Sequence, residues 1–228
     1  MLTVAIHQPE YLPCLSLLDK VKRSDVLVLL DDVQFKRDSL QQRAKIAGPR
    51  GLEWLTIPFV HRFPQLVREV EVADPTWPER HAEKIKTAYR NAPGFARAWP
   101  TIEDFMERCR ERATKRLYLT SAGSMGMLAG AFGLTTPTVS SSTLGAAGAK
   151  GDRVLDICRR LDATHYLSGR TGASYLDRAA FAAAGVEIVV QDFTFPWYRP
   201  DLPEGADRGL SALDALMHLG ASTAELLA

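Results

Sequence analysis

Cysteine is scarce in this chain of 228 residues, and its three copies lie far apart. Cys14, Cys109 and Cys158 form no CxxC pair and have no histidine at metal-ligand spacing, so the sequence predicts no zinc or other metal site. The odd number of cysteines also argues against a disulfide scaffold. We therefore expect a reduced, cytoplasmic protein.

The sequence also lacks long apolar runs and an excess of charge of either sign. No run approaches the roughly 20 residues that a membrane span needs, and the N-terminus begins with a strand pattern instead of a signal peptide. With 28 basic and 27 acidic residues the net charge is +1, so nothing predicts nucleic acid as a partner. The expected partners are a small-molecule substrate and, as a second option, an acyl-carrier protein.

An alternation of strands and helices is what the sequence does contain. Val4 to Ile6 and Val26 to Leu30 are continuous apolar runs, typical of strands buried on both faces of a parallel sheet. The same rhythm returns in the last third of the chain. We predict one α/β domain over residues 1–228, with a Rossmann-like, mostly parallel sheet and helices on both faces.

The middle of the chain, residues 77–133, follows helical periodicity and is predicted to be a helical insertion or subdomain. Thr101, three residues before Asp104, resembles an N-cap, so a helix is predicted to start there. Val67 to Val72 alternates apolar and charged residues, which predicts a half-exposed strand or a strand end.

Reactive side chains follow the first strand directly. His7 could act as an acid or base near neutral pH, or could cap a neighbouring loop. Cys14 follows Pro13, which suits the first turn of a helix, and a helix N-terminus stabilises a thiolate. Cys14 is therefore a candidate nucleophile, although a free cysteine is more often a small buried apolar residue. In the same loop, Gln8 and Tyr11 are predicted to bind substrate.

A second polar loop begins where the strand at Val26 to Leu30 ends. Asp32 is predicted to be catalytic, as a carboxylate that takes a proton from an amine, and Asp31 is predicted to bind substrate. The alternatives are that they cap a helix or a turn, or that they bind a divalent metal, although no DxD motif or metal triad is completed, so no metal site is predicted. Because the carboxyl ends of parallel strands meet at one edge of a sheet, we expect His7, Cys14 and Asp32 to converge in one pocket.

Two further segments have the composition of anion sites. Residues 35–51 are strongly basic, and this segment is either an anion clamp or a solvated loop; Gln34, Lys36 and Arg43 are the predicted binding residues. The Gly-rich segment 168–174 is either an anion cradle or a tight turn, and matches neither the Walker A nor the GxGxxG pattern. Here Ser168, Gly169 and Tyr175 are the predicted binding residues.

Several motifs, in order through nearly the whole chain, together resemble the WbqC-like protein family. They are His7-Gln8-Pro9-Glu10-Tyr11-Leu12-Pro13, Asp19-Lys20, Leu30-Asp31-Asp32-Val33-Gln34-Phe35, Tyr166-Leu167-Ser168-Gly169, Tyr175-Leu176-Asp177, Gln191-Asp192-Phe193 and Leu210-Ser211-Ala212-Leu213-Asp214. The resemblance implies an enzyme-like protein of bacterial surface-polysaccharide or secondary-metabolite gene clusters, with transfer chemistry expected. The family usually continues its opening motif with tryptophan, glycine and aromatic residues, where this chain has Cys14, Ser16, Leu17 and Leu18.

Three functions follow from these observations. The first is acyl transfer, forming an amide or ester on an amino-sugar or natural-product intermediate, with no cofactor required. It would run through a Cys14 thioester with His7 as base, or directly with His7 or Asp32 as base. The second is nucleotide-dependent carboxylate activation by a nucleotidyltransferase-like or ligase-like enzyme. The third is a non-catalytic module that binds a substrate or carrier protein.

Overall fold

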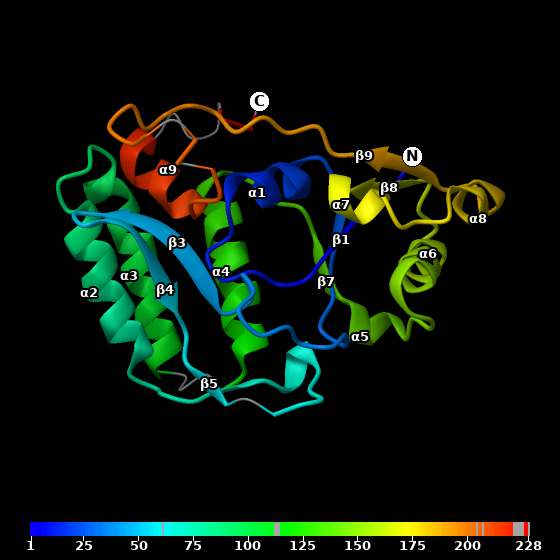
Figure 1. Cartoon of the computed structure of the whole chain (residues 1–228), viewed down its shortest axis with the longest axis horizontal. Helices are drawn as coiled ribbons and strands as arrows, with labels where there is room; N and C mark the ends of the chain where they lie inside the picture. The colour runs from blue at the N-terminus through cyan, green and yellow to red at the C-terminus, as the bar shows by residue number, and fades with distance from the viewer. Residues whose placement is uncertain (61, 112–114, 204, 207, 221–225, 228) are drawn as a thin grey trace.

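Five strands form one parallel sheet in the computed structural model of this chain (Figure 1). The structure describes residues 1–60, 62–111, 115–203, 205–206, 208–220 and 226–227. The strand order is β7-β2-β1-β8-β9, and each neighbouring pair is parallel. The strands are β1 (Thr3–His7), β2 (Val26–Leu29), β7 (Thr138–Ser140), β8 (His165–Ser168) and β9 (Glu187–Val190). The predicted Rossmann-like α/β fold is confirmed.

The direction of sheet growth reverses between β1 and β8. From β1 the chain builds outward through β2 to β7, then returns to the other side of β1 for β8 and β9. Connections on the two sides of this reversal leave toward opposite faces of the sheet, which opens a crevice at the carboxyl ends of β1 and β8.

Alternating side chains of β1 separate two apolar layers. Val4 and Ile6 pack with α6 (Lys150–Arg160) and α8 (Arg178–Ala183), whereas Ala5 packs with α1 (Leu15–Lys22) and with Met125. Each buried valine or leucine in these layers contributes about 1.5–3 kcal/mol. Helices therefore cover both faces of the sheet, as the continuous apolar runs predict.

A second core lies beside the sheet and includes the predicted helical segment. It is built by α2 (Trp77–Tyr89), α3 (Phe95–Glu111), α4 (Leu117–Ala131), α9 (Ala212–Leu219) and the hairpin of β3 (Arg43–Gly48) and β4 (Gly51–Thr56) (Figure 1). The shorter elements are β5 (Phe59–Val60), η1 (Val67–Glu69), β6 (Glu71–Val72), α5 (Ser141–Leu144) and α7 (Arg170–Ala173). The helices confirm a helical segment in the middle of the chain, while its status as a subdomain stays a prediction.

The predicted helix start at Thr101 is wrong, because α3 already begins at Phe95 and contains Pro100. A proline inside a helix removes a backbone hydrogen bond and costs about 3 kcal/mol. Upstream packing offsets this cost, since Ala98 is buried and Phe95 stacks on Trp99 with ring centroids 5.3 Å apart. Similarly, Val67–Glu69 forms one 3₁₀ turn and only Glu71–Val72 pairs as a strand, so that alternation marks a strand end.

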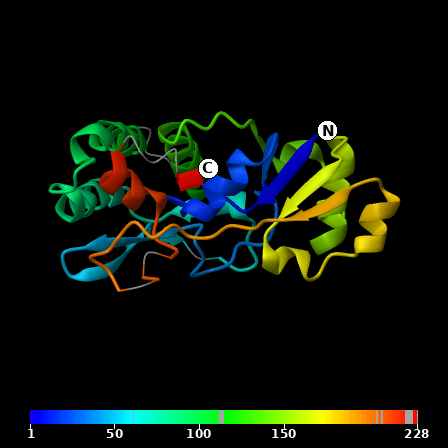
Figure 2. The ribbon, with the colours of Figure 1, turned by 90° about the horizontal axis from the view of Figure 1, so that it is seen from above.

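A long segment after β9 crosses from the sheet to the helical layer, as both views show for residues 191–203 (Figures 1 and 2). Arg199 fixes it there: its Nη1 donates to the buried Asp214 Oδ2 of α9 at 2.6 Å, and Asp214 also accepts from the Tyr89 hydroxyl at 2.9 Å. Over the ranges described above, no helix has both the length and the apolar character that crossing a bilayer requires.

Candidate functional site

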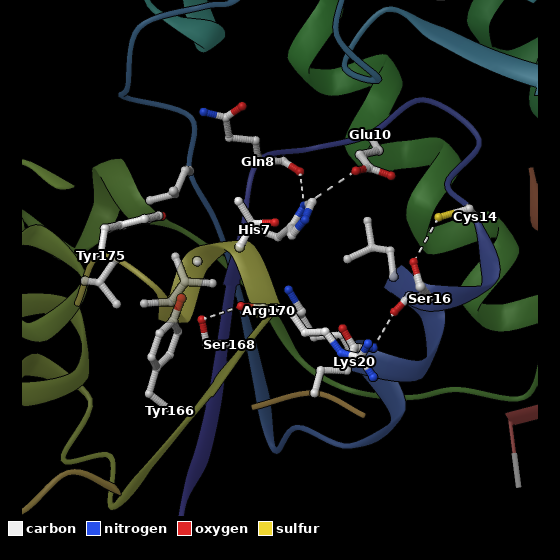
Figure 3. A pocket seen from close by; sticks show the side chains of 18 residues that line it. His7, Gln8, Glu10, Cys14, Ser16, Lys20, Tyr166, Ser168, Arg170 and Tyr175 are labelled. Atoms are coloured by element: carbon white, nitrogen blue, oxygen red, sulfur yellow. Dashed lines mark hydrogen bonds and ion pairs between the residues drawn. The ribbon is translucent and has the colours of Figure 1, made fainter. Parts of the chain in front are cut away.

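A cavity of about 500 Å³ lies at the carboxyl ends of β1 and β8, the position where the sheet order reverses (Figure 3). Its volume suits a small molecule. The polar residues that line it come from the loop after β1, from α1, from the turn after β8 and from the end of β9. They are His7, Gln8, Glu10, Cys14, Ser16, Lys20, Ser168, Arg170, Thr171, Tyr175 and Gln191.

The structure brings together about half of the residues that the sequence predicts for the site. The predicted residues in the cavity lining are His7, Gln8, Cys14, Ser168, Gly169 and Tyr175. The others lie outside it: Tyr11, Asp31, Asp32, Gln34, Lys36 and Arg43. The expected convergence of His7, Cys14 and Asp32 is thus correct for the first two and wrong for Asp32.

The loop after β1 is held from below by α4. Leu12 has a φ of 43°, a left-handed conformation that non-glycine residues seldom adopt, and its N–H donates to Ser124 Oγ at 2.9 Å. Tyr11 is buried, and its hydroxyl donates to His81 Nδ1 at 2.8 Å. Tyr11 is therefore an anchor that fixes the loop to the helical layer, which explains why it does not reach the cavity.

His7 is neutral at pH 7. Its Nδ1 donates to the Gln8 carbonyl at 2.8 Å, because a carbonyl can only accept, and this leaves Nε2 as a hydrogen-bond acceptor. Burial, and then the positive charge of Lys20, lower the pKa of His7 to about 4. His7 can therefore accept a hydrogen bond through Nε2 and is a weak base.

Glu10 is the group in the cavity whose protonation changes near neutral pH. Its side chain is only 12% exposed, and burial raises its pKa to about 7, against the opposing effect of Lys20. Its Oε2 is buried and has no hydrogen-bond partner among the described residues. A carboxylate with this pKa is matched to proton transfer at physiological pH.

Cys14 stands at the N-cap of α1, as Pro13 predicts, yet its thiol is not activated. Burial and the nearby Glu10 carboxylate raise the pKa of Cys14 above its usual value. Its Sγ lies 3.2 Å from Ser16 Oγ. Desolvation and a neighbouring negative charge both disfavour a thiolate and here exceed the stabilising effect of the helix terminus.

The turn after β8 is compact, because residues 170–173 of the Gly-rich segment form the single helical turn α7. Ser168 is fully buried and donates to the Gly169 carbonyl at 3.1 Å. A Cβ at Gly172 would lie 2.8 Å from Ser168 Oγ, so only glycine fits there without displacement. Tyr175 is 61% exposed at the mouth of the cavity.

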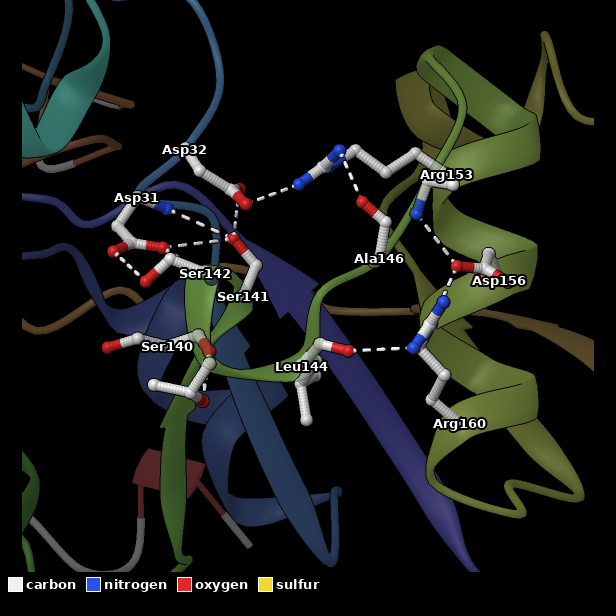
Figure 4. Close-up of polar contacts among 12 residues, drawn as sticks. Asp31, Asp32, Ser140, Ser141, Ser142, Leu144, Ala146, Arg153, Asp156 and Arg160 are labelled. Atoms are coloured by element: carbon white, nitrogen blue, oxygen red, sulfur yellow. Dashed lines mark hydrogen bonds and ion pairs between the residues drawn. The ribbon is translucent and has the colours of Figure 1, made fainter.

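Asp31 and Asp32 are occupied in a separate polar cluster (Figure 4). Asp32 pairs with Arg153 of α6 and accepts from the Ser141 hydroxyl. Asp31 accepts from the backbone N–H and hydroxyl of Ser142 at 2.8 and 2.6 Å. The two carboxylates tie the end of β2 to the segment after its neighbour β7, so the cap interpretation describes their contacts.

The basic segment 35–51 does not form an anion clamp at the cavity. Gln34 Nε2 donates to the Gln65 carbonyl at 2.9 Å, and Lys36 is exposed. The Arg43 guanidinium stacks on Trp54 at 4.4 Å from the ring centroid and donates to the Asp38 carbonyl. In the part of the chain that the structure covers, no group of three or more His, Cys, Asp or Glu side chains is arranged to hold a metal.

Sequence reasoning did not assign Lys20 to the site, and it named Glu10 without giving it a role. Lys20 lies on α1, where Ser16, Leu17 and Lys20 all line the cavity. Lys20 is three residues after Leu17 and four after Ser16, a spacing that places it on the same helical face as each of them. That spacing after Cys14 is the signal that could have found Lys20.

Comparison with known proteins gives family-level matches. The model of the WbqC-like protein family matches residues 8–225. Rv1507c, an uncharacterised protein of Mycobacterium tuberculosis (strain ATCC 25618 / H37Rv), is 27% identical over 232 residues, spanning 100% of this chain and 98% of that protein. No solved structure matches the chain.

Proposed function

The chain belongs to the WbqC-like protein family, and from this premise we propose that it is a transferase that acylates an amine by direct transfer. The acceptor is an amino sugar or a natural-product intermediate of bacterial polysaccharide or secondary-metabolite biosynthesis. The observation that carries the proposal is Glu10, a buried carboxyl with a pKa of about 7 in a cavity of small-molecule size.

Glu10 acts as the general base. The amine nitrogen of the acceptor attacks the acyl carbon of the donor, a C–N bond forms, and the bond from the acyl carbon to the donor's leaving atom breaks. The Glu10 carboxylate takes the proton that the amine loses. His7 Nε2, a neutral acceptor, orients a donor group of the acceptor substrate.

Direct transfer is favoured over a Cys14 thioester. The raised pKa of Cys14 keeps it as a thiol at neutral pH, and a thiol is a poor nucleophile. Its sulfur contacts the Ser16 hydroxyl, which is no base. Asp32 is engaged with Arg153, so it is not proposed as the base.

The test is an acylation assay with amino-sugar acceptors and three donor types: acetyl-coenzyme A, acetyl phosphate and an acyl-carrier thioester. Mass spectrometry detects the amide product. Wild type and Cys14→Ala should both form it, whereas Glu10→Gln should lose roughly 10²-fold or more of the rate, the usual contribution of a general base. An acyl adduct on Cys14, or no product with any donor, overturns the proposal.

Nucleotide-dependent carboxylate activation is the second candidate, because the cavity occupies the position where sheets of this kind bind nucleotides. It predicts a thermal shift with ATP or CTP in the presence of Mg²⁺. The absence of any shift with either nucleotide counts against it and leaves acyl transfer.

A further inference from the structure

We propose that the cavity contains a subsite for a compact anion, a carboxylate or phosphate group of the substrate, where the Lys20 ammonium meets Gly169. This inference deepens the proposed function, because it names the chemical class of substrate that the same cavity accepts. Lys20 and Gly169 come from segments almost 150 residues apart, and together they form one wall of the cavity.

Lys20 is a buried cation without a direct partner. The residue is 6% exposed and lines the cavity, yet Nζ makes no hydrogen bond or ion pair with any residue that the structure describes. A buried ammonium is stable only when a negative group compensates it. The cavity supplies the space for such a group from the substrate.

Gly169 lets the ammonium lie against the end of β8. A Cβ at this position would stand 3.6 Å from Lys20 Nζ. The φ of Gly169 is −69°, so the backbone there does not need glycine. The absent side chain instead leaves space beside the ammonium, and both residues line the cavity.

Negative groups act on Lys20 without a hydrogen bond or ion pair to its ammonium among the described residues. Burial lowers the pKa of Lys20, and the charges of Glu10 and Asp19 oppose that effect. Burial raises the pKa of Glu10 to about 7, and the Asp19 carboxylate accepts from Gln191 Nε2 at 2.7 Å and pairs with Arg23 at 3.7 Å. At the mouth, Arg170 pairs with Asp192 at 2.8 Å. His7, on which the charge of Lys20 also acts, is neutral. Lys20 is therefore the cation that an entering anion meets.

Glu10 and Lys20 lie on different sides of the cavity and have different proposed roles, proton transfer for Glu10 and anion binding for Lys20. In Figure 3, His7, Glu10 and Cys14 lie along the upper side of the cavity, and Lys20 and Ser168 lie below them. A substrate whose anionic group binds Lys20 would extend its reactive end toward Glu10. The expected substrate thus carries a carboxylate or phosphate at one end and the acyl or amino group at the other.

Thermal shift measurements with sodium phosphate and with sodium acetate, against sodium chloride at equal ionic strength and pH 6.5, test the subsite. Wild type should gain stability with one or both anions. Lys20→Met should weaken the affinity for the anion, taken from the dependence of the shift on anion concentration, by about tenfold to hundredfold, the value of a hydrogen bond to a charged group. Lys22→Met, which removes the same charge from the exposed side of α1, is the matched control and should respond as wild type.

Gly169→Ala is a second variant that does not remove the lysine. Its methyl group would meet Nζ at ordinary contact distance, so the fold should persist while the affinity for the anion falls. A larger response to phosphate identifies a phosphate-bearing substrate, and a larger response to acetate identifies a carboxylate. Equal responses in wild type and Lys20→Met, or no response to either anion in wild type, overturn the subsite.

Glu10→Gln separates this inference from the proposed function. Removing a negative charge beside Lys20 should leave anion binding as tight as in wild type or tighter, while acyl transfer is lost. If Lys20→Met abolishes anion binding and no acyl transfer is ever observed, the subsite stands and the proposed reaction fails. If transfer occurs but the anion response is insensitive to Lys20, the subsite fails alone.

Discussion

Burial disfavours the charged forms of His7, Glu10 and Cys14, and its chemical consequence differs from residue to residue. It keeps Cys14 as a thiol and His7 as a neutral imidazole, and in both cases it moves the group away from a reactive state. For Glu10 the same effect moves the pKa from an ordinary acidic value to about 7, where the carboxyl exchanges its proton readily. Of the three side chains, Glu10 is thus the one that desolvation makes suitable as a general base at neutral pH.

The pH dependence of acyl transfer tests this selection. Glu10 must be a carboxylate to accept a proton, so kcat/KM should rise as pH increases through about 7 and reach a plateau above it. Steady-state rates between pH 5.5 and 8.5 measure this limb. Glu10→Gln should have a low rate that does not rise as pH increases through 7.

Cys14→Ser is the control for this profile, because it keeps the side chain small and polar and removes the thiol. It should retain the same apparent pKa as wild type. If the rise of kcat/KM near pH 7 persists in Glu10→Gln and disappears in Cys14→Ser, the base is the Cys14 side chain.

At this scale the sequence predicts which residues follow strand ends, and that is enough to place His7, Gln8, Ser168 and Gly169 in the cavity. It does not predict the protonation of Glu10 or the exposure of Lys20. Both depend on how α1 docks, to which Gln191 at the end of β9 contributes by donating to the Ser16 carbonyl and to Asp19 Oδ2, each at 2.7 Å.

At the scale of elements, β2 differs from β1 and β8 in what its carboxyl end meets. The loops after β1 and β8 flank the reversal of the sheet and leave an open cavity between them. The loop after β2 lies beside β7, whose own continuation places the hydroxyls of Ser141 and Ser142 against Asp31 and Asp32 (Figure 4). Strand pairing of segments more than 100 residues apart decides this difference, so the sequence pattern alone could not.

Asp32→Asn should lower stability and leave acyl transfer unchanged in the folded protein. The substitution removes the carboxylate that Arg153 contacts, with both side chains largely buried, and the cost should be about 1.5–3 kcal/mol. Urea unfolding gives the change in the free energy of unfolding, and kcat/KM is measured on the same preparation.

Thr143→Ala is a suitable control, since Thr143 lies in the same serine-rich turn and its hydroxyl donates only to the Ser140 carbonyl at an exposed position. It should change stability by less than Asp32→Asn. If Asp32→Asn instead abolishes transfer at unchanged stability, Asp32 is catalytic after all.

At the scale of the whole molecule, the sequence predicts the fold class and the helical segment, because continuous apolar runs and helical periodicity are local signals. It does not predict that the hairpin of β3 and β4 joins the helical layer, or that residues 191–203 cross back to α9. These are long-range contacts. His81 makes two of the long-range contacts, because it forms hydrogen bonds with Tyr11 of the loop after β1 and with the Thr56 carbonyl of β4.

His81 makes the folding stability of the protein depend on pH. It is 4% exposed, and burial lowers its pKa to about 4. As pH falls through 6.5 the unfolded chain binds a proton that folded His81 does not bind until about pH 4, so the unfolded state binds more protons in this interval and stability falls with decreasing pH.

The loss expected from His81 between pH 7.5 and pH 4 is about 3 kcal/mol. Urea unfolding at a series of pH values should show it, and His81→Gln should reduce the slope, because its side-chain amide can bond Tyr11 or Thr56 without titrating. Tyr11→Phe is the matched control: it removes the same hydrogen bond but keeps the imidazole, so it should lower stability at every pH and retain the acid sensitivity. Equal slopes in wild type and His81→Gln would show that acid destabilisation originates at other buried groups, such as His7, whose pKa is also lowered to about 4.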